Sequence, residues 1–356
     1  MTDLKDLEYK ELEEFVIGLG EKKYRAAQLF KWLHSGVVSY DEMSDLSKAF
    51  REKLKEISYV SALEIEQKLV SKLDGTVKYL FRLPDGNSIE SVVMRYKHGL
   101  TICVSSQVGC RMGCRFCAST IGGLYRSLTA GEILDQLLFA EKDLNERISN
   151  IVLMGIGEPL DNYDNVIRFL HNVNNEKGRN IGYRHITLST CGIVPAIYTL
   201  ANEKLPITLT ISLHAPNDRI RNSIMPISLK YSIEELMNAC KYYTEKTGRR
   251  LSFEYSLISG VNDSAENARE LARLVRPLGA HINLIPVNKV EERSYSHGSK
   301  DDINAFCAIL TEKGINATIR RELGSDISAS CGQLRKKAAN ITETERSSRG
   351  EDHSND

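Results

Sequence analysis

Beyond residue 100 the chain alternates between short apolar stretches, typical of strands, and longer stretches with helical periodicity. The strand-like stretches cover residues 101–106, 148–154, 185–189, 207–213, 250–258 and 281–287. The clearest helix is expected over residues 132–143, with Thr129 before it as an N-cap. This alternation predicts an α/β fold with parallel strands, as a curved open sheet or partial (β/α)6 barrel. Chemistry in such folds lies at the carboxyl ends of the strands.

The first part of the chain has apolar positions at helical spacing and predicts an N-terminal helical accessory domain over residues 1–60. Its cations lie close in sequence to two aromatic residues, Tyr24 and Trp32. The cations form either a solvated helix face or, with the rings stacking on bases, an RNA-binding surface. The sequence leaves both interpretations open.

Residues 61–95 have the alternation of strands, and Asp-Gly pairs at 74–75 and 85–86 indicate tight turns. This segment predicts a β-hairpin extension. The catalytic domain is then expected over residues 96–335. The remaining residues, 336–356, are polar and charged, so we expect them to be disordered.

The net charge limits which partners this chain can attract by overall electrostatics. Its 356 residues include 47 basic and 47 acidic ones, which gives a formal net charge of zero. A balanced charge provides no general attraction to nucleic acid, so any RNA binding depends on local patches. No apolar run approaches the length of a membrane span. The chain starts with polar residues rather than an apolar signal segment, so we expect a cytoplasmic, reducing environment.

Three cysteines, Cys110, Cys114 and Cys117, lie in one loop after the first predicted strand. A closed zinc site needs four protein ligands, and no further Cys or His follows at the usual short spacing. A disulfide knot is disfavoured in a reducing compartment. Three thiolates on an iron–sulfur cluster would leave one iron open to bind another molecule. The odd number therefore favours a reactive cluster, with a zinc site and coincidence as the alternatives.

Small or polar residues end several of the other predicted strands. They are Gly157 and Glu158, Ser189, Ser212-Leu213-His214, and Asn288. Taken singly, each is what an ordinary turn or polar strand end would show. Taken together at one rim of a barrel, they could hydrogen-bond a polar cofactor, and the glycines would let the backbone approach it closely.

The spacing Cys-x3-Cys-x-Phe-Cys after a first barrel strand resembles the radical S-adenosylmethionine superfamily. The resemblance implies a [4Fe-4S] cluster held by Cys110, Cys114 and Cys117, whose fourth iron binds the amino and carboxylate groups of S-adenosylmethionine. It also implies that the strand-end residues named above contact this cofactor.

Three further residues, Glu90, Cys103 and Cys331, narrow the resemblance. Together with residues 105–110, 154–159, 185–190, 212–216, 260–263 and 331–334, they resemble the RlmN family of dual-specificity adenine-2-methyltransferases. The resemblance covers residues 10–336. It implies methylation of carbon 2 of an adenosine in the peptidyl-transferase region of 23S rRNA and of the adenosine next to the anticodon in tRNA.

The same resemblance implies catalytic roles. A first S-adenosylmethionine methylates Cys331, and a second is cleaved to a radical that takes hydrogen from this methyl group, so two are used per turnover. The methylene radical adds to the adenine. Cys103 then forms a transient disulfide with Cys331, and we assign removal of the carbon-2 proton to Glu90. The thiolate of Cys103 is the competent nucleophile.

Partners follow from this chemistry. Electrons must come from a flavodoxin or ferredoxin system, because the chain shows no second cluster motif, and we expect a monomer. Basic residues near the motifs could contact RNA phosphates, or could be solvated or paired with acids instead. They are Arg111, Arg115, Arg126, Arg320, Arg321, Arg335, Lys336 and Lys337.

Two departures from the family pattern are Cys191, where serine is common, and Ser328, where aspartate is common. The nearest alternative is a Cfr-type enzyme, which methylates carbon 8 of the same rRNA adenosine and shares the cysteines and Glu90. A different class would be a zinc-stabilised RNA-binding protein without catalysis.

Overall fold

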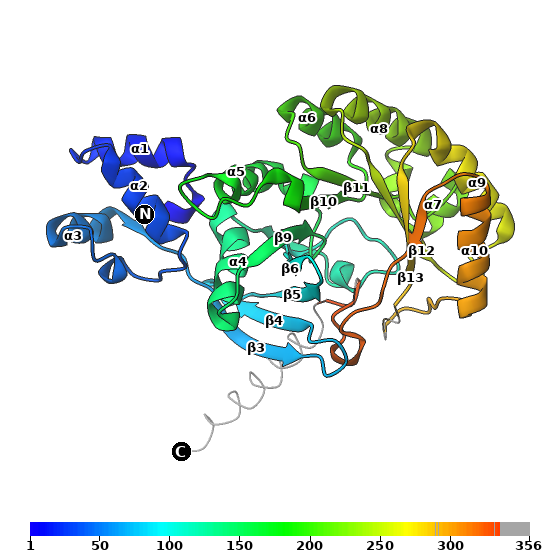
Figure 1. Cartoon of the computed structure of the whole chain (residues 1–356), viewed down its shortest axis with the longest axis horizontal. Helices are drawn as coiled ribbons and strands as arrows, with labels where there is room; N and C mark the ends of the chain where they lie inside the picture. Colours follow the sequence, from blue (N-terminus) through cyan, green and yellow to red (C-terminus); the bar gives the residue numbers. More distant parts are fainter. Residues whose placement is uncertain (289, 291, 331, 335–356) are drawn as a thin grey trace, which may run out of the picture.

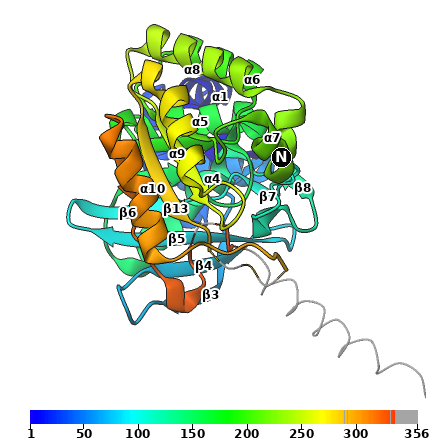
Figure 2. The ribbon, with the colours of Figure 1, turned by 90° about the vertical axis from the view of Figure 1, so that its right-hand side faces the viewer.

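A single curved sheet organises the molecule (Figures 1 and 2). The computed structural model describes residues 1–288, 290, 292–330 and 332–334. Cys331 and the segment 336–356, for which we predicted a catalytic role and disorder respectively, lie outside the described residues. Ten strands form the sheet in the order β14-β13-β12-β11-β10-β9-β6-β5-β4-β3.

The strands from β6 to β14 run parallel, as the alternation of the sequence predicts. They are β6 (Gly99–Cys103), β9 (Ile148–Leu153), β10 (Ile186–Thr190), β11 (Thr208–Ser212), β12 (Ser252–Leu257), β13 (His281–Pro286) and β14 (Ala317–Ile319). The first six correspond to the six predicted strands, and β14 extends the sheet at the free side of β13. The fold is therefore a partial barrel of the predicted α/β class.

Helices cover the outer face of this sheet in both ribbon views (Figures 1 and 2). They are α4 (Ala130–Leu144), α5 (Tyr163–Asn174), α6 (Val194–Glu203), α8 (Ile233–Thr247), α9 (Ala265–Val275) and α10 (Lys300–Glu312). The short α7 (Asp218–Ile224) lies at the rim instead, where Ile224 packs in one cluster with Cys191 and Cys114. In α4 the Thr129 side chain accepts a hydrogen bond from Glu132 N, so the predicted N-cap is confirmed. The apolar faces of the helices and sheet form one large core. No helix in the described ranges is long and apolar enough to cross a membrane.

An antiparallel extension continues the sheet on the other side of β6. It consists of β3 (Glu64–Val70), β4 (Val77–Arg82) and β5 (Ser88–Tyr96). The two Asp-Gly turns connect these strands as predicted, and Gly75 and Gly86 both adopt positive φ. Glu90 pairs with Leu80 and Val92 pairs with Cys103. Since alternate residues of a strand share a face, Glu90 and Cys103 lie on the same face of the sheet.

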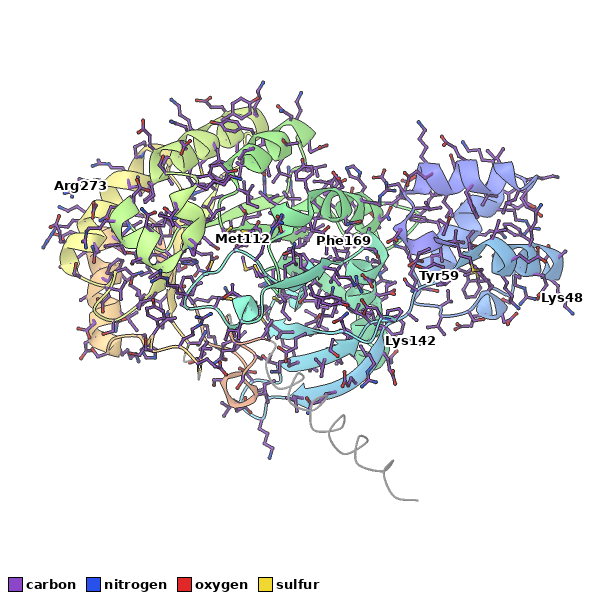
Figure 3. All side chains as sticks on the ribbon, turned by 180° about the vertical axis from the view of Figure 1, so that it is seen from behind. Lys48, Tyr59, Met112, Lys142, Phe169 and Arg273 are labelled. Atoms are coloured by element: carbon purple, nitrogen blue, oxygen red, sulfur yellow. The ribbon has the colours of Figure 1, made fainter. Side chains whose placement is uncertain are left out.

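The N-terminal residues form a separate cluster of helices beside the barrel (Figures 1 and 3). The helices are α1 (Tyr9–Gly18), α2 (Tyr24–Leu33) and α3 (Lys48–Ile57), and a short pair of strands, β1 (Thr2–Asp3) and β2 (Ser58–Tyr59), closes the cluster. Lys5 anchors it to the barrel, because its ammonium lies 2.5 Å from a carboxylate oxygen of Asp135 in α4 and both side chains are fully buried.

Candidate functional site

A cavity lies where the carboxyl ends of the parallel strands meet. Strand ends and loops far apart in the sequence line it together. Of the predicted site residues, those on the cavity wall are Cys110, Cys114, Cys117, Gly157, Glu158, Ser189, Ser212, His214 and Asn288. The curvature of the sheet thus brings nearly the whole predicted cofactor set to one place.

The cysteine loop has a fixed backbone. It is framed by a two-stranded ribbon of β7 (Gln107–Gly109) and β8 (Leu124–Ser127), and Cys110 N donates to Gly123 O at 3.1 Å. Gly113 adopts φ +73°, and a Cβ there would lie 3.3 Å from the ring of Pro226. The loop geometry therefore depends on a glycine between the first two cysteines. Met112, labelled in Figure 3, belongs to this loop and lines the cavity.

The donor set suits an iron–sulfur cluster. Burial, the largest cause, raises the pKa of Cys110 to about 12 and also raises the pKa of Cys114, and the neighbouring Cys117 adds to both shifts. Thiols whose pKa is raised in this way need a cationic centre nearby before they can be thiolates. Among the described residues no three His, Cys, Asp or Glu side chains are arranged to hold a single metal ion. In a cluster, each thiolate binds an iron of its own.

Glu158 fastens two strand ends together beneath the cavity. Its carboxylate accepts hydrogen bonds from Leu160 N at 3.0 Å and from Cys191 N at 2.7 Å. Burial raises the pKa of this carboxyl, and the hydrogen bond from Cys191 N is the largest opposing effect. The side chain of Thr190 also hydrogen-bonds this carboxylate, and Glu158 lines the cavity, so an ammonium group of a ligand bound there could approach it.

The glycines of the same stretch are required by close packing. Gly157 adopts φ +110°, and a Cβ there would lie 2.7 Å from Gln107 Cβ. A Cβ on Gly155 would lie 2.6 Å from the carbonyl oxygen of Val104. The end of β9 therefore lies directly against the segment that leads into the cysteine loop.

The next strands present small polar groups and one histidine. Ser189 Oγ and Ser212 Oγ are 3.4 Å apart on the cavity wall. His214 adopts a left-handed backbone, and its Nδ1 accepts a hydrogen bond from Ser256 N at 2.9 Å. Burial lowers the pKa of His214 to about 3, so the ring is neutral with its proton on Nε2. The side chain of Leu213, in contrast, is fully buried in the barrel core and does not line the cavity.

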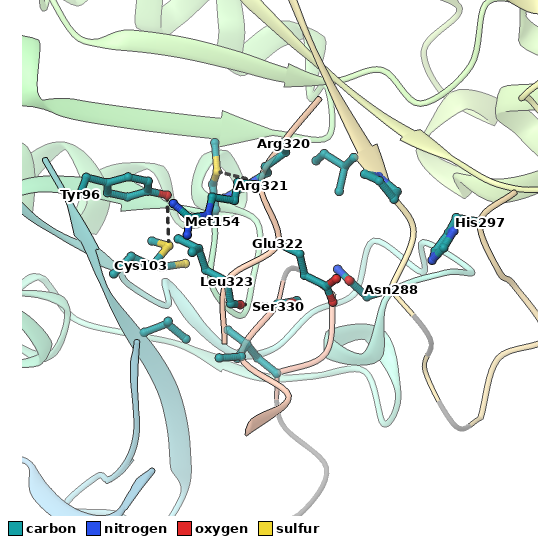
Figure 4. Close-up of a pocket in the computed structure, with 16 residues that line it drawn as sticks. Tyr96, Cys103, Met154, Asn288, His297, Arg320, Arg321, Glu322, Leu323 and Ser330 are labelled. Atoms are coloured by element: carbon teal, nitrogen blue, oxygen red, sulfur yellow. Dashed lines mark hydrogen bonds between the residues drawn. The ribbon is translucent and has the colours of Figure 1, made fainter. Parts of the chain in front are cut away.

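A second cavity adjoins the first and contains Cys103 (Figure 4). Met154, Asn288 and Arg320 line both cavities. The two sequence neighbours of Cys331 line different cavities: Ser330 lines the second cavity and Gly332 lines the first. None of the seven cysteines that the structure describes is in a disulfide.

Comparisons with known proteins agree with this geometry. The family model of the ribosomal RNA large subunit methyltransferase N-terminal domain matches residues 2–60, and that of the radical SAM superfamily matches residues 104–272. A probable dual-specificity RNA methyltransferase RlmN from Alkaliphilus oremlandii is 57% identical, over 94% of this chain and 98% of its own. The chain belongs to the RlmN family of radical S-adenosylmethionine RNA methyltransferases.

Two further similarities extend this result. The RlmN relative of Lachnospira eligens is also 57% identical, over 95% of this chain and 97% of its own. The crystal structure of a radical SAM methyltransferase from Sphaerobacter thermophilus superposes with a TM-score of 0.90 at 46% identity. The superposition covers 94% of this chain and 99% of the chain from Sphaerobacter thermophilus. Membership of the superfamily implies S-adenosylmethionine and an iron–sulfur cluster as cofactors.

Several basic residues of this RlmN-family chain are already paired with acids. Arg111 pairs with Asp161, and Arg126 pairs with Asp85 and Glu132. Among the other basic candidates, Arg320 pairs with Glu254. Arg115 and Arg321 are exposed. Arg335, Lys336 and Lys337 lie outside the described residues. Of the two N-terminal aromatic residues only Tyr24 is largely exposed, because Trp32 packs against the helical cluster.

Two buried charged residues near the site were not predicted from the sequence. Arg221 is fully buried, and its guanidinium donates to the carbonyl oxygens of Cys191 at 2.6 Å and Leu213 at 3.1 Å. Glu254 lines the first cavity and accepts from Asn283 Nδ2 at 3.0 Å. In the sequence Arg221 belongs to a polar helix and Glu254 to an apolar strand, and neither stands in a motif. A charged residue inside the apolar stretch 250–258 was the only available signal.

Replacing Gly157 by alanine should weaken S-adenosylmethionine binding by about five- to 150-fold, because the new Cβ meets Gln107 and strain of about 1–3 kcal/mol must be relieved by moving the loop. Gly86→Ala is the matched control, since Gly86 also has positive φ but nothing lies within 4 Å of its Cβ position. Equilibrium dialysis with reconstituted protein measures both affinities. Equal affinities for the two variants would contradict the role of this close contact.

Proposed function

We propose that this protein methylates carbon 2 of adenosine in RNA, in the peptidyl-transferase region of 23S rRNA and next to the anticodon of tRNA. The observation that carries the proposal is the pair of adjoining cavities, one with the three cysteines and the polar strand ends, the other with Cys103. The residues beside Cys331 belong to both walls. Relatives with 57% identity are named as probable dual-specificity RNA methyltransferases, which supports two RNA substrates here.

In this proposal Cys110, Cys114 and Cys117 hold a [4Fe-4S] cluster and the polar strand ends hold S-adenosylmethionine. When bound, the cluster would supply one electron for reductive cleavage of S-adenosylmethionine, the radical chemistry by which a methyl group on Cys331 would lose a hydrogen atom. Glu158 accepts from the ammonium of the cofactor, and Ser189, Ser212, His214 and Asn288 hydrogen-bond its remaining polar groups. Phe116 excludes water, since its ring lies edge-on to His214 with centroids 5.0 Å apart.

We assign release of the product to Cys103, which lines the second cavity, and to Glu90, which lines neither cavity but lies on the same face of the sheet as Cys103. Addition of the methylene radical leaves an unpaired electron on the adenine adduct, and this electron would pass to a one-electron acceptor, the oxidised cluster or the external flavodoxin or ferredoxin system. Glu90 takes the proton from carbon 2 while the C–H electron pair stays in the ring, which leaves the adenine joined to Cys331 through a methylene group. The Cys103 thiolate attacks the Cys331 sulfur, so a disulfide forms as the sulfur–carbon bond breaks. The methylene carbon takes a proton and becomes the methyl group. Two S-adenosylmethionine molecules are used in each turnover, one as methyl donor and one as radical source.

We assign RNA contacts to the N-terminal helical domain and to exposed cations near the cavities. Arg115 and Arg321 are exposed, and Arg321 also lines the second cavity. The exposed ring of Tyr24 lies under the guanidinium of Arg25, at 5.1 Å, and offers a stacking surface. The protein acts in the cytoplasm as a monomer and receives electrons from a flavodoxin or ferredoxin system.

The direct test is an anaerobic assay of reconstituted protein on a 23S rRNA fragment and on a tRNA. We expect 2-methyladenosine in both products, detected by mass spectrometry of the nucleosides. 8-Methyladenosine in the rRNA fragment would instead identify a Cfr-type enzyme. RNA binding without any methylated nucleoside, by protein that contains zinc and no sulfide, would identify a non-catalytic RNA-binding protein.

Cys103→Ala should trap a covalent protein–RNA adduct, because the thiolate that releases Cys331 is missing. Denaturing gels with labelled RNA detect the adduct, and methylated product should fall by at least about a hundredfold. Cys307→Ala is the control, since Cys307 lies on α10 outside both cavities. Normal turnover by Cys103→Ala, with no adduct, would show that the release scheme is wrong.

A further inference from the structure

We propose that Lys78 is a positioning residue for the release step, because one ammonium group holds both the carboxylate of Glu90 and the loop that leads to Cys331. The inference rests on the proposed function. It adds a residue to which no role has been assigned and which lies on a different strand from every catalytic residue named above.

The register of the extension brings Lys78 to the catalytic face. Lys78 on β4 pairs with Val92 on β5, and Val92 pairs in turn with Cys103 on β6. Residues directly opposite one another in antiparallel strands share a face. Glu90 lies two residues before Val92 on that same face, so Lys78 and Glu90 form a diagonal pair. The Nζ atom of Lys78 is 3.3 Å from Glu90 Oε1.

Burial of this ion pair carries a desolvation cost. The side chains of Lys78 and Glu90 are only 7% and 6% exposed. A carboxylate removed from water is strongly disfavoured unless an opposite charge and hydrogen bonds compensate it. A base must be anionic to accept a proton. The ammonium of Lys78 therefore supports the form of Glu90 that the release step needs, and also fixes the direction of its carboxylate.

The second contact of Lys78 reaches the loop before Cys331. Its Nζ donates to the carbonyl oxygen of Ser328 at 3.2 Å, three residues before Cys331 in the sequence. Two hydrogen bonds from the neighbouring β3–β4 turn fasten the same loop, Gly324 N to Asp74 Oδ2 and Lys72 N to Asp326 Oδ2, both at 2.9 Å. The antiparallel extension thus holds the loop by its turn and by one buried cation.

The loop so held forms one wall of the second cavity. Leu323 and Ser330, both labelled in Figure 4, line this cavity, and Leu323 packs against the apolar cluster that contains Cys103. Ala329 and Leu334 pack with Cys103, Val92 and Met94 in one small apolar cluster. Lys78 lines neither cavity, so it acts through Glu90 and the loop rather than on the RNA or the cofactor. Its loss should affect release and spare cleavage of S-adenosylmethionine.

The experiment compares Lys78→Met, Lys78→Arg and Lys78→Gln with the wild-type protein. For Lys78→Met we expect 5'-deoxyadenosine still to form, the protein–RNA adduct to accumulate, and release of methylated RNA to slow by at least about tenfold. Lys78→Arg keeps the charge and should recover most of the release rate. Lys78→Gln keeps a donor for Ser328 but no charge, so it should remain slow and accumulate adduct. The control is Lys68→Met on β3, whose ammonium pairs with Asp143 instead.

The outcomes separate the two proposals. If wild-type protein forms no methylated adenosine, the proposed function fails whatever the variants do. If the wild type turns over and Lys78→Met releases RNA as fast as Lys68→Met, without adduct, the role of Lys78 is overturned. Thermal unfolding followed by circular dichroism shows whether Lys78→Met is folded at the assay temperature. If it is not, the comparison of Lys78→Arg with Lys78→Gln decides, and equal release rates for these two variants would overturn the proposal.

Discussion

The parallel hydrogen-bonded ladder from β6 to β13 is the constraint on which the site depends. Its register joins Cys103 to Val152, Leu188 to Leu153 and Ser212 to Glu254, so neighbouring strands end close to the same rim. A parallel strand can reach its neighbour only through a crossover connection, which places a helix outside and leaves the loops at the carboxyl ends facing one another. The cysteine loop and the polar strand ends share a cavity for this reason.

Buried polar groups then fix the strand ends against each other. Glu158 ties the end of β9 to that of β10, and Arg221 gathers the carbonyl oxygens that follow β10 and β11. Such groups are expensive to bury, and each makes hydrogen bonds to the backbone of another segment, Glu158 to Cys191 and Arg221 to Cys191 and Leu213. The site is thereby organised before any ligand binds. The second cavity is organised differently, by the antiparallel extension and its contacts to residues 324–328.

Local signals account for what could be predicted from the sequence. The N-cap at Thr129, the Asp-Gly turns and the strand alternation each depend on neighbouring residues, and the structure agrees with all of them. The cysteine spacing likewise sits within one loop. Lys78 could not be predicted, since its partners depend on the register between β4 and β5 and on a loop 250 residues later. The acid partners of Arg111 and Arg126 also come from other segments. Because these arginines are paired within the protein, they are less suited to bind RNA phosphates than the sequence suggested.

The central claim is that three thiolates at this rim support homolytic cleavage of S-adenosylmethionine. The most direct measurement is the yield of 5'-deoxyadenosine from anaerobically reconstituted protein given a strong reductant, together with its iron and sulfide content. The account predicts brown protein with iron and sulfide in near equal amounts and steady release of 5'-deoxyadenosine, both lost in Cys114→Ala and kept in Cys307→Ala. Colourless protein that binds zinc, lacks sulfide and releases no 5'-deoxyadenosine would contradict it.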